Sequence, residues 1–538
     1  MNKFLLYFHT IRHLKLIQVV FRLYYKVFKP RKTGSEIIDF DNIRFPELTI
    51  LEFAAPSLFK ENKVCFLNKG GSVDNSTDWN SSEKDKLWLY NLHYFDDLNS
   101  KLSKDSFELQ VYWVKKWILE NPLVEEGNGW EAYPISLRIV NWIKWLGKHN
   151  YHDESILTSL YEQACVLRSR LEYHILGNHL FANAKALIFA GVVFNNSKND
   201  FLKVGISILE KELDEQFLED GGHFELTPMY HSIMLNDLLD IFQLKKHFSH
   251  QMSRKIELII VKAFAWLSSM THQDEEIAFF NDATFGIAPR YIELEEYAKC
   301  LGLNHFDKPN SKLNYLSNSG YISFKDERHS LIFDVGDVGP DYLPGHAHAD
   351  TLSLEWSIRG RRVFVNSGIS EYGVSDLRQF QRSSKSHNCL VIDGEDSSEV
   401  WGGFRVARRA KVDNVSCAES ASGFTLKARH DGYSRIYKGL LHSREVTLEG
   451  NKLIVTDSLT KKPNKTFVMF YLHPDVSAEL LDSHRVKILS GNSEIELSSS
   501  GFVSILPSKW FPGFGKDIES RVLKVDFQDT RCITEVSF

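Results

Sequence analysis

Histidines spaced closely with carboxylates are the residues of this sequence best suited to acid–base chemistry. The segment Asp337–Trp356 (DVGPDYLPGHAHADTLSLEW) places His346, His348 and Asp350 at alternate positions. In an extended chain, alternate side chains point to the same side, and histidine is the side chain whose ordinary pKa lies nearest neutrality. Three titratable groups at this spacing, preceded by Gly and Pro, predict a functional site rather than packing alone.

A second cluster lies in the segment Glu219–Leu235 (EDGGHFELTPMYHSIML). Four polar or titratable residues share nine positions, namely His223, Glu225, Tyr230 and His231. The Gly-Gly pair allows a sharp turn, and Pro228 is typical of the first turn of a helix. This turn could present side chains for chemistry. Helix capping, with Tyr230 as a core aromatic residue, explains the same pattern, so both interpretations stay open.

Two further segments carry polar groups at informative spacing. In Gly177–Leu187 (GNHLFANAKAL), His179 and Asn183 share one helix face and Asn178 is adjacent. A cap or an interhelix hydrogen bond accounts for them equally well, because buried amides and imidazoles need partners. In RSSKSHNCLVIDG, His387 begins a predicted strand, and together with His348 it could supply nitrogen ligands to a Zn²⁺-type ion.

Helical periodicity dominates residues 85–312. The segment 133–149 (YPISLRIVNWIKWLGKH) places apolar residues at helical spacing and Gly147 near its end. Amphipathic segments of helix length recur at 155–175, 205–218, 235–248 and 255–270. Serial helical hairpins of this kind build bundles or α/α toroids.

The pattern changes near residue 315, so residues 313–538 are predicted to form a separate domain. Short segments such as GYISFKD, SLIFDVG, HNCLVIDG and TFVMFYLHPD are rich in β-branched and aromatic residues and end in Gly, Asn or Asp. Arg359-Gly360 and Gly450-Asn451 have the composition of hairpin turns. These features predict an antiparallel β-sandwich.

The composition restricts the class of partner and the compartment. A chain of 538 residues is expected to form two or three domains. The formal charge of −6, without a basic domain, argues against nucleic acid, although a local basic cleft for an anionic glycan remains compatible. The six cysteines are scattered without a CxxC pair, which indicates free thiols in a reducing compartment.

Residues 1–84 are predicted to be an N-terminal basic amphipathic helix followed by an extended lead-in. The apolar residues of segment 1–32 are interrupted by Arg12, His13, Lys15, Arg22 and Lys26. A secretory signal and a membrane-spanning helix are therefore not expected, and the predicted location is cytoplasmic. The helix could dock on the body of the protein or make peripheral contact with a membrane.

In the order of its motifs, the chain resembles the heparinase II/III family of polysaccharide lyases. The resemblance runs through LWLYNLHYFDDL, NGWEAYPISLRIVNW, GNHLFANAKAL, GGHFELTPMYH, FFND, GHAHADTLSLEW, VFVNSG and SHNCLVIDG. It covers most of the chain and is closest to members that lack a secretion signal and accompany bacterial surface-polysaccharide genes. It implies a multidomain fold, an incomplete (α/α) toroid over 85–312 followed by the β-sandwich.

The resemblance also implies a chemistry, the cleavage of a uronic-acid-containing acidic polysaccharide by β-elimination. It assigns neutralisation of the uronate carboxylate to Asn178 and His179, and the acid–base pair to Tyr230 and His346. Which of that pair is the base is left open, because it depends on the configuration at C5 of the sugar. Oligomeric state is open as well.

Further roles extend this assignment. Arg138, His223, Glu225 and Tyr372 are the predicted substrate-binding residues, with an interhelix ion pair as the alternative for Arg138. Family members with a metal in the β-domain bind it through two His and one Asp, at positions that match His348, Asn366 and His387. Asparagine replaces the aspartate here and is a poorer ligand for a structural Zn²⁺.

Two other functions compete with a lyase. One is a non-catalytic glycan-binding or assembly protein of surface-polysaccharide biosynthesis, which the basic N-terminal helix favours but which would not need Tyr230 and His346. The other is a hydrolase with Glu225 and Asp350 as paired carboxylates, which would have to lie about 5–10 Å apart.

Overall fold

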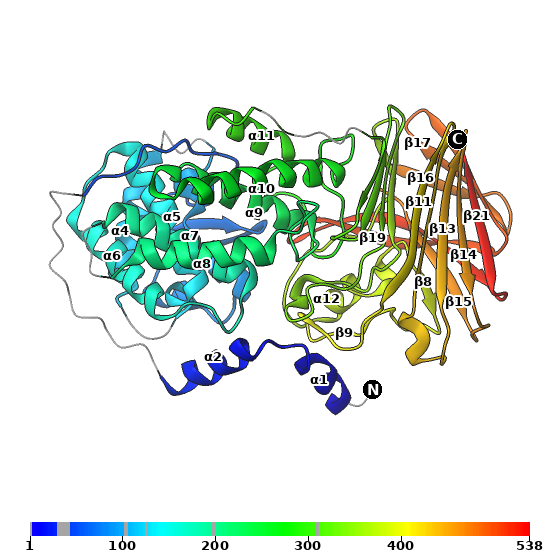
Figure 1. The fold of residues 1–538 in the computed structure, drawn as a ribbon, viewed down its shortest axis with the longest axis horizontal. Coiled ribbons are helices and arrows are strands. Elements are labelled where there is room, and N and C mark those ends of the chain that lie inside the picture. Colours follow the sequence, from blue (N-terminus) through cyan, green and yellow to red (C-terminus); the bar gives the residue numbers. More distant parts are fainter. Residues whose placement is uncertain are drawn as a thin grey trace.

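The computed structural model divides into a helical half and a half built from β-sheets (Figure 1). It describes residues 3–28, 43–101, 106–123, 127–195, 199–304, 306 and 311–538. Residues 29–32, the end of the predicted N-terminal helix, lie outside these ranges. The rest of that segment forms two helices, α1 (Lys3–Ile11) and α2 (Leu16–Val27), rather than one.

The helical half is an incomplete toroid that agrees with the periodicity of the sequence. Its helices are α3 (Lys86–Tyr94), α4 (Phe107–Glu120), α5 (Ala132–His149), α6 (Glu154–Ser169), α7 (Gly177–Val193), α8 (Phe201–Gln216), α9 (Pro228–Phe242), α10 (His250–Ser269) and α11 (Tyr291–Cys300). Each predicted helical segment overlaps one of them, although α6 ends six residues before the predicted segment does.

Aromatic side chains fill the centre of this half. Trp113, Trp117, Trp142 and Trp145 are fully buried in one continuous core with the leucines and isoleucines of α5 to α10. Burying an aromatic ring of this size removes about 150–250 Å² from water. The high aromatic content is therefore explained largely by packing.

Three antiparallel sheets form the β-sandwich half. The first is β3-β4-β5-β6-β7, with β3 (Leu313–Leu316), β4 (Tyr321–Lys325), β5 (His329–Asp334), β6 (Leu354–Ile358) and β7 (Arg361–Phe364). The second is β19-β20-β15-β8, with β19 (Phe502–Gly513), β20 (Lys516–Phe527), β15 (Thr466–Tyr471) and β8 (Leu390–Ile392).

The third and largest sheet has the order β11-β12-β13-β14-β21-β18-β17-β16. Its strands are β11 (Val412–Ser420), β12 (Gly423–His430), β13 (His442–Glu449), β14 (Lys452–Leu459), β16 (Val476–Leu480), β17 (Arg485–Ser490), β18 (Ser493–Ser499) and β21 (Arg531–Ser537). One hydrophobic core draws residues from all three sheets, among them Ile322, Val446 and Val468. Two short ribbons, β1 (Lys63–Phe66) with β2 (Lys69–Ser72) and β9 (Val400–Trp401) with β10 (Arg405–Val406), lie outside these sheets.

Both predicted hairpin turns are present. Ile358 pairs with Arg361 across Arg359-Gly360, and both turn residues have positive φ, 51° and 76°. This is the backbone of a two-residue turn that follows the twist of its strands. Gly450-Asn451 connects β13 to β14 in the same manner, between paired Glu449 and Lys452.

The chain between α10 and α11 joins the two halves. There Phe279 stacks on Trp510 of β19, with ring centroids 5.6 Å apart. His272 lies 3.0 Å from the carboxylate of Glu355 on β6, and both side chains are fully buried. These contacts pack the loop, up to Phe285, between the toroid and the sandwich.

Two further expectations concern cysteines and membranes. None of the six cysteines, all of which lie in the described part of the chain, forms a disulfide bond. Among the described residues, no helix is both long enough and apolar enough to span a bilayer.

Candidate active site

Tyr230 lies in the first turn of α9, where helix capping fixes its backbone. Thr227 is the N-cap: its side-chain oxygen accepts from the Tyr230 N–H at 3.3 Å, and its hydroxyl donates to the Asp282 carbonyl at 2.7 Å. The phenol oxygens of Tyr230 and Tyr372 lie 3.1 Å apart. Burial, and next the neighbouring Tyr372, raises the pKa of Tyr230 well above its ordinary value. The Tyr230 hydroxyl is therefore protonated at neutral pH.

His346 lies directly against this tyrosine. It is the last residue of the short 3-10 helix η7 (Pro344–His346), and its ring centroid is 4.0 Å from that of Tyr230. Its Nδ1 lies 2.8 Å from Asp282 Oδ2, and its Nε2 lies 3.6 Å from Glu225 Oε2. Because an ionised carboxylate only accepts, Nδ1 donates to Asp282. Nε2 is then the ring nitrogen that Asp282 leaves unoccupied, and the side chain is 15% exposed.

Asp282 organises the sandwich side of the site. Its two oxygens contact His346 Nδ1 and His348 Nε2, each at 2.8 Å, and both also accept from the guanidinium of Arg378 on α12 (Asp376–Gln381). Burial by itself would raise the pKa of Asp282, but Arg378 and the two histidines outweigh it and hold the pKa well below its ordinary value. The carboxylate therefore stays ionised, which fixes the ring orientation of both histidines.

The toroid contributes a second polar group at the N-terminal end of α7. His179 Nδ1 lies 2.9 Å from Glu172 Oε1, and Asn183 donates to Glu172 Oε2 at 3.0 Å. Burial alone would lower the pKa of His179, but Glu172 outweighs it and raises the pKa. The ring stacks on Tyr133 with centroids 4.3 Å apart and remains partly exposed. Asn183 thus has the structural role, whereas His179 is accessible and the neighbouring Glu172 favours its charged form.

Glu225 connects the two groups. The backbone N–H of Asn178 donates to Glu225 Oε1 at 3.5 Å, while Glu225 Oε2 faces His346. Gly177, at φ 58°, makes this approach possible, because a Cβ there would lie 2.3 Å from Leu343 and 3.0 Å from Glu225 Oε1. Predicted site residues from the toroid and from the sandwich therefore form one continuous set of contacts.

Not every predicted residue belongs to that set. Tyr372 does, through the Tyr230 hydroxyl, and its ring lies 5.8 Å from His346. Arg138 is fully buried in the toroid, where it donates to Gln163 Oε1 and to the carbonyls of His93 and Gly129.

His223 is fully buried as well. Its Nε2 lies 3.0 Å from Gln216 Oε1, and its backbone N–H donates to His231 Nδ1 at 3.1 Å. A polymer could not touch Arg138 or His223 without rearrangement of the core. The hydrogen-bond partners of Arg138 are neutral, so it forms interhelix hydrogen bonds in place of the ion pair given above as its alternative.

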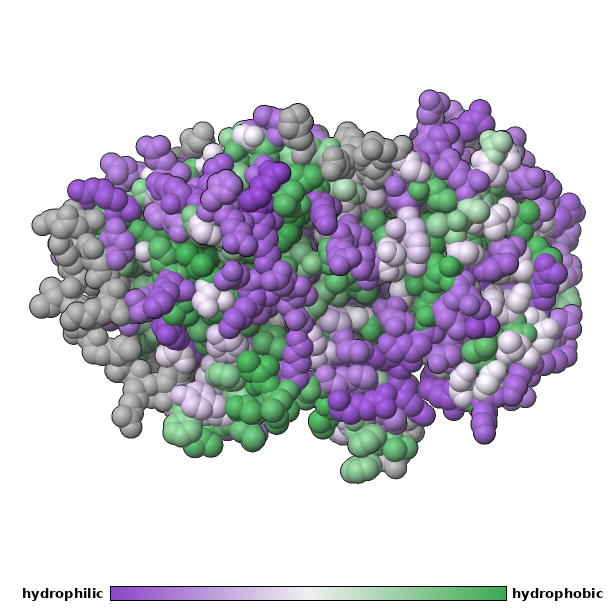
Figure 2. All heavy atoms as spheres, in the orientation of Figure 1, coloured by the Kyte–Doolittle hydropathy of each residue, from purple (hydrophilic) through white to green (hydrophobic). Residues whose placement is uncertain are grey.

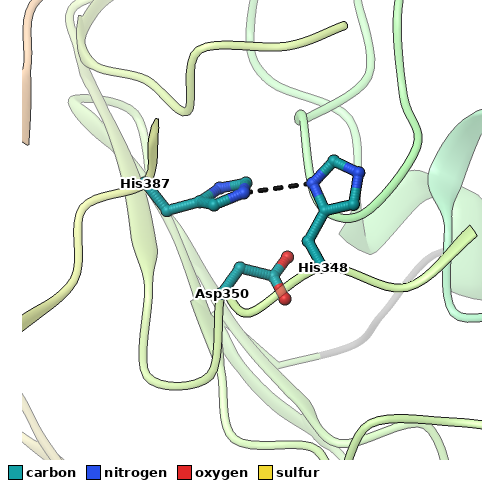
Figure 3. Close-up of side chains that lie close together, drawn as sticks. All are labelled: His348, Asp350 and His387. Atoms are coloured by element: carbon teal, nitrogen blue, oxygen red, sulfur yellow. Dashed lines mark hydrogen bonds between the residues drawn. The ribbon is translucent and has the colours of Figure 1, made fainter. Parts of the chain in front are cut away.

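A buried triad suited to a metal begins two residues after His346. His348, Asp350 and His387 each offer one ligand atom, all within 4.8 Å of one another (Figure 3). His348 Nε2 donates to Asp282, so its Nδ1 is an acceptor, and it accepts a hydrogen bond from His387 Nε2 at 3.1 Å. A ligating histidine oriented by a carboxylate on its other nitrogen is the usual arrangement around a metal.

The triad contains a carboxylate that was not among the predicted ligands. Asp350 supplies the carboxylate of this triad, two residues after His348. The carboxamide oxygen of Asn366 accepts from the Ser353 hydroxyl at 2.6 Å and from the Asn388 N–H at 3.3 Å. Both of its lone pairs are thus engaged within the protein. The HAHAD spacing already contained the signal for Asp350.

Sequence reasoning missed Asp282, Glu172 and Arg378. Asp282 ends the FFND motif, which contributed to the family resemblance without receiving a role. Glu172 lies seven residues before His179, but on a turn rather than on the same helix. Arg378 has no local pattern, because its partner is 96 residues away in the sequence.

Two family models match the chain in succession. The heparinase II/III N-terminus covers residues 47–301 and the heparinase II/III-like C-terminal model covers residues 308–538. Between them they include the helical half, the sheets and all residues of the site described above. The chain belongs to the heparinase II/III family.

The similar proteins of established function are heparin-sulfate lyases. That of Pedobacter heparinus is 26% identical over 266 residues, covering 45% of this chain and 39% of that protein. That of Bacteroides thetaiotaomicron is 24% identical over 345 residues, covering 55% and 49%. The chain spans half or less of the length of these curated relatives.

Solved structures agree on the fold. Heparinase III superposes with a TM-score of 0.70 at 18% identity, covering 96% of this chain and 88% of that one. The heparan sulfate lyase of Pedobacter heparinus gives 0.59 at 18% identity, covering 97% and 87%. The toroid followed by a β-sandwich is therefore the architecture of this chain.

Proposed function

We propose that this protein is a polysaccharide lyase that cleaves a uronate-containing acidic glycan by β-elimination. The observation that carries the proposal is the contact of Tyr230, from the toroid, with His346, from the sandwich. The ring centroids of these two residues lie 4.0 Å apart. Membership of the heparinase II/III family and the similarity to heparin-sulfate lyases support the same reaction.

The first requirement is to neutralise the uronate carboxylate. The C5 proton of a uronate becomes acidic only when the negative charge that develops can spread onto a carboxylate held by hydrogen bonds or positive charge. In our proposal this group is bound by the carboxamide of Asn178 and by His179, whose charged form Glu172 favours. Glu172 acts as a positioning residue through His179.

The second requirement is a base and an acid. We assign the base to His346 Nε2, because Asp282 occupies Nδ1 and stabilises the ring once it is protonated. The C5–H bond breaks and its proton goes to Nε2. The electron pair forms the C4=C5 double bond, the C4–O bond breaks, and the leaving oxygen takes the proton of the Tyr230 hydroxyl. The raised pKa of Tyr230 suits this acid role.

The His348–Asp350–His387 triad is proposed to hold a structural metal ion, and Zn²⁺ suits two imidazoles and a carboxylate. When bound, such an ion would stiffen the loop that carries His346. No proton transfer passes through it.

The test offers purified protein a panel of uronate polysaccharides, including bacterial surface glycans, and follows the ultraviolet absorbance of the unsaturated product. Tyr230→Phe and His346→Ala should each lower kcat/KM by about 10²–10⁴. Full activity in both variants would disprove the site. Binding of a glycan without any product would favour the non-catalytic assembly protein instead.

The acid and base assignments are tested separately by exchange at C5 in deuterated water. Tyr230→Phe should still exchange the C5 hydrogen while failing to cleave, whereas His346→Ala should do neither. If instead His346→Ala exchanged the C5 hydrogen and Tyr230→Phe did not, Tyr230 would be the base and His346 the acid. The lyase proposal itself would stand.

A further inference from the structure

Helix α2 presents its apolar stripe to solvent instead of to the protein. Leu16, Val20, Leu23 and Val27 recur at spacings of three and four, so they share one face, and they are 50–77% exposed. An ordinary surface helix buries such a stripe. The face that α2 turns toward the protein instead contains Gln18, which is 1% exposed.

Helix α1 repeats this inversion. Phe8 and Ile11 lie three positions apart and are more than half exposed, and Tyr7, which directly precedes Phe8, is also exposed, while Leu6 is buried. Figure 2 shows hydrophobic side chains gathered along the lower edge of the molecule, where Figure 1 places these two helices. Exposed apolar area of this extent marks an interaction site.

The charges of the same segment indicate the kind of surface that it meets. Residues 1–35 contain eight lysines and arginines and no aspartate or glutamate, although the whole chain has a net charge of −6. On α2, Arg22 and Lys26 follow the edge of the apolar stripe at helical spacing, and Lys15, the N-cap residue, forms an ion pair with Glu215. An apolar face bordered by cations is the pattern of a helix that lies in the interface of an anionic bilayer.

Both helices are fastened to the protein, so the apolar surface has a fixed orientation. Gln18 donates to the carbonyls of Ile175 and Tyr342 at 3.1 and 3.4 Å, and Tyr25 donates to the carbonyl of Leu171. On α1, Thr10 accepts from the indole N–H of Trp401 at 3.1 Å. The contacts of α2 thus reach both halves and that of α1 reaches the sandwich.

We propose that α1 and α2 form a peripheral membrane anchor that binds the surface of an anionic lipid bilayer. The exposed stripes enter the acyl boundary, and the flanking cations bind lipid phosphates. The fastening to both halves then holds the candidate active site at a constant height above the membrane. This inference is independent of the proposed reaction.

The test is flotation of the full chain with vesicles. We expect binding to an equal mixture of phosphatidylglycerol and phosphatidylcholine, weaker binding to phosphatidylcholine alone, and weaker binding to the mixture at high salt. The stripe variant L16S/L23S/V27S should lower the partition coefficient by about a hundredfold or more, since each side chain contributes about a factor of ten. Its far-ultraviolet circular dichroism and melting temperature should match the parent.

A matched control removes exposed apolar side chains elsewhere. L119S/L489S/F502S replaces residues on α4, β17 and β19 that are 80%, 41% and 61% exposed, and it should bind vesicles like the parent. A charge variant, K3E/K26E, should lose preference for the anionic mixture, whereas K60E/K462E should not.

Three results would overturn the proposal. The parent might not float with anionic vesicles at low salt, or the stripe and control variants might bind equally. The parent might also form dimers that the stripe variant abolishes, without vesicle binding, which would assign the surface to a second copy of the chain.

Discussion

Two buried clusters in this protein contain the same kinds of side chain, an aspartate with histidine and arginine, but differ in their surroundings. In one, Asp282 contacts His346, His348 and Arg378. In the other, within the large sheet, Asp457 contacts His442 and Arg444, with Oδ1 at 2.6 Å from His442 Nε2 and 2.8 Å from Arg444 Nε.

The difference lies in access rather than in composition. In both clusters burial would raise the pKa of the aspartate, and an arginine lowers it, to about 2 for Asp457. His442 is enclosed by β12 and β14, whereas His346 is partly exposed and stacks on Tyr230. A cluster of histidine, carboxylate and arginine is therefore not enough to indicate an active site. The histidine ring must also reach solvent and lie beside a second group that can exchange a proton.

The comparison is tested most strongly by replacing each aspartate with asparagine. Asp282→Asn should lower kcat/KM by about 10²–10⁴, because His346 loses the partner that orients it. Asp457→Asn should leave kcat per folded molecule unchanged and lower the free energy of unfolding by about 3–5 kcal/mol, because Arg444 stays buried without its partner. Chemical denaturation and activity per folded molecule measure the two effects, and equal loss of activity would remove the distinction.

Metal removal tests whether the Asp282 cluster has a second function. A chelator should lower the melting temperature of the parent by several degrees, whereas His387→Ala should melt lower from the start and not respond. His430 lies 3.0 Å from His442 in the cluster around Asp457, which we call the sheet cluster. His430→Ala is the matched control and should respond to the chelator like the parent. Metal analysis of the purified protein checks the assignment directly, and no bound metal with no chelator effect would contradict it.

A smaller effect is expected from Glu172. Because Glu172 raises the pKa of His179, Glu172→Gln should lower that pKa and move the alkaline limb of the activity profile to lower pH. Glu212→Gln, a buried substitution on α8, should leave the limb in place. An unchanged profile in Glu172→Gln would show that the charge of His179 does not limit the reaction.

The smallest effect concerns acid stability of the sheet cluster. Burial lowers the pKa of His430 and His442 in the folded protein, so the unfolded chain takes up protons first as the pH falls below about 6.5. Stability from these neutral rings is complete above that pH and is lost below it. His442→Gln should make the free energy of unfolding less dependent on pH between 5 and 6.5, and an unaltered slope would refute this account.

Local sequence patterns predicted the elements well. Helical spacing located α5 to within one residue, and the Arg359-Gly360 pair located a hairpin, because both depend on neighbours in the chain. The end of α6 was less well predicted, since the residues after Ser169 keep an amphipathic composition while the chain turns toward Glu172.

The site was predicted only in part. Tyr230 and His346 were paired by family resemblance, and their contact depends on two domains that no local pattern brings together. Arg138 was predicted to bind substrate but is buried. The sequence of an amphipathic helix does not show whether an arginine faces solvent or, as here, a buried glutamine. Asp282 acts through partners 64 and 96 residues away, so only the folded chain reveals it.

The carboxamide of Gln18 has a mechanical consequence. One side chain donates to a carbonyl of the toroid, Ile175, and to a carbonyl of the loop that leads to His346, Tyr342. A rotation that spread the two halves would have to break one of these bonds. The opening between the two halves is therefore restrained at this corner by two hydrogen bonds from a single amide.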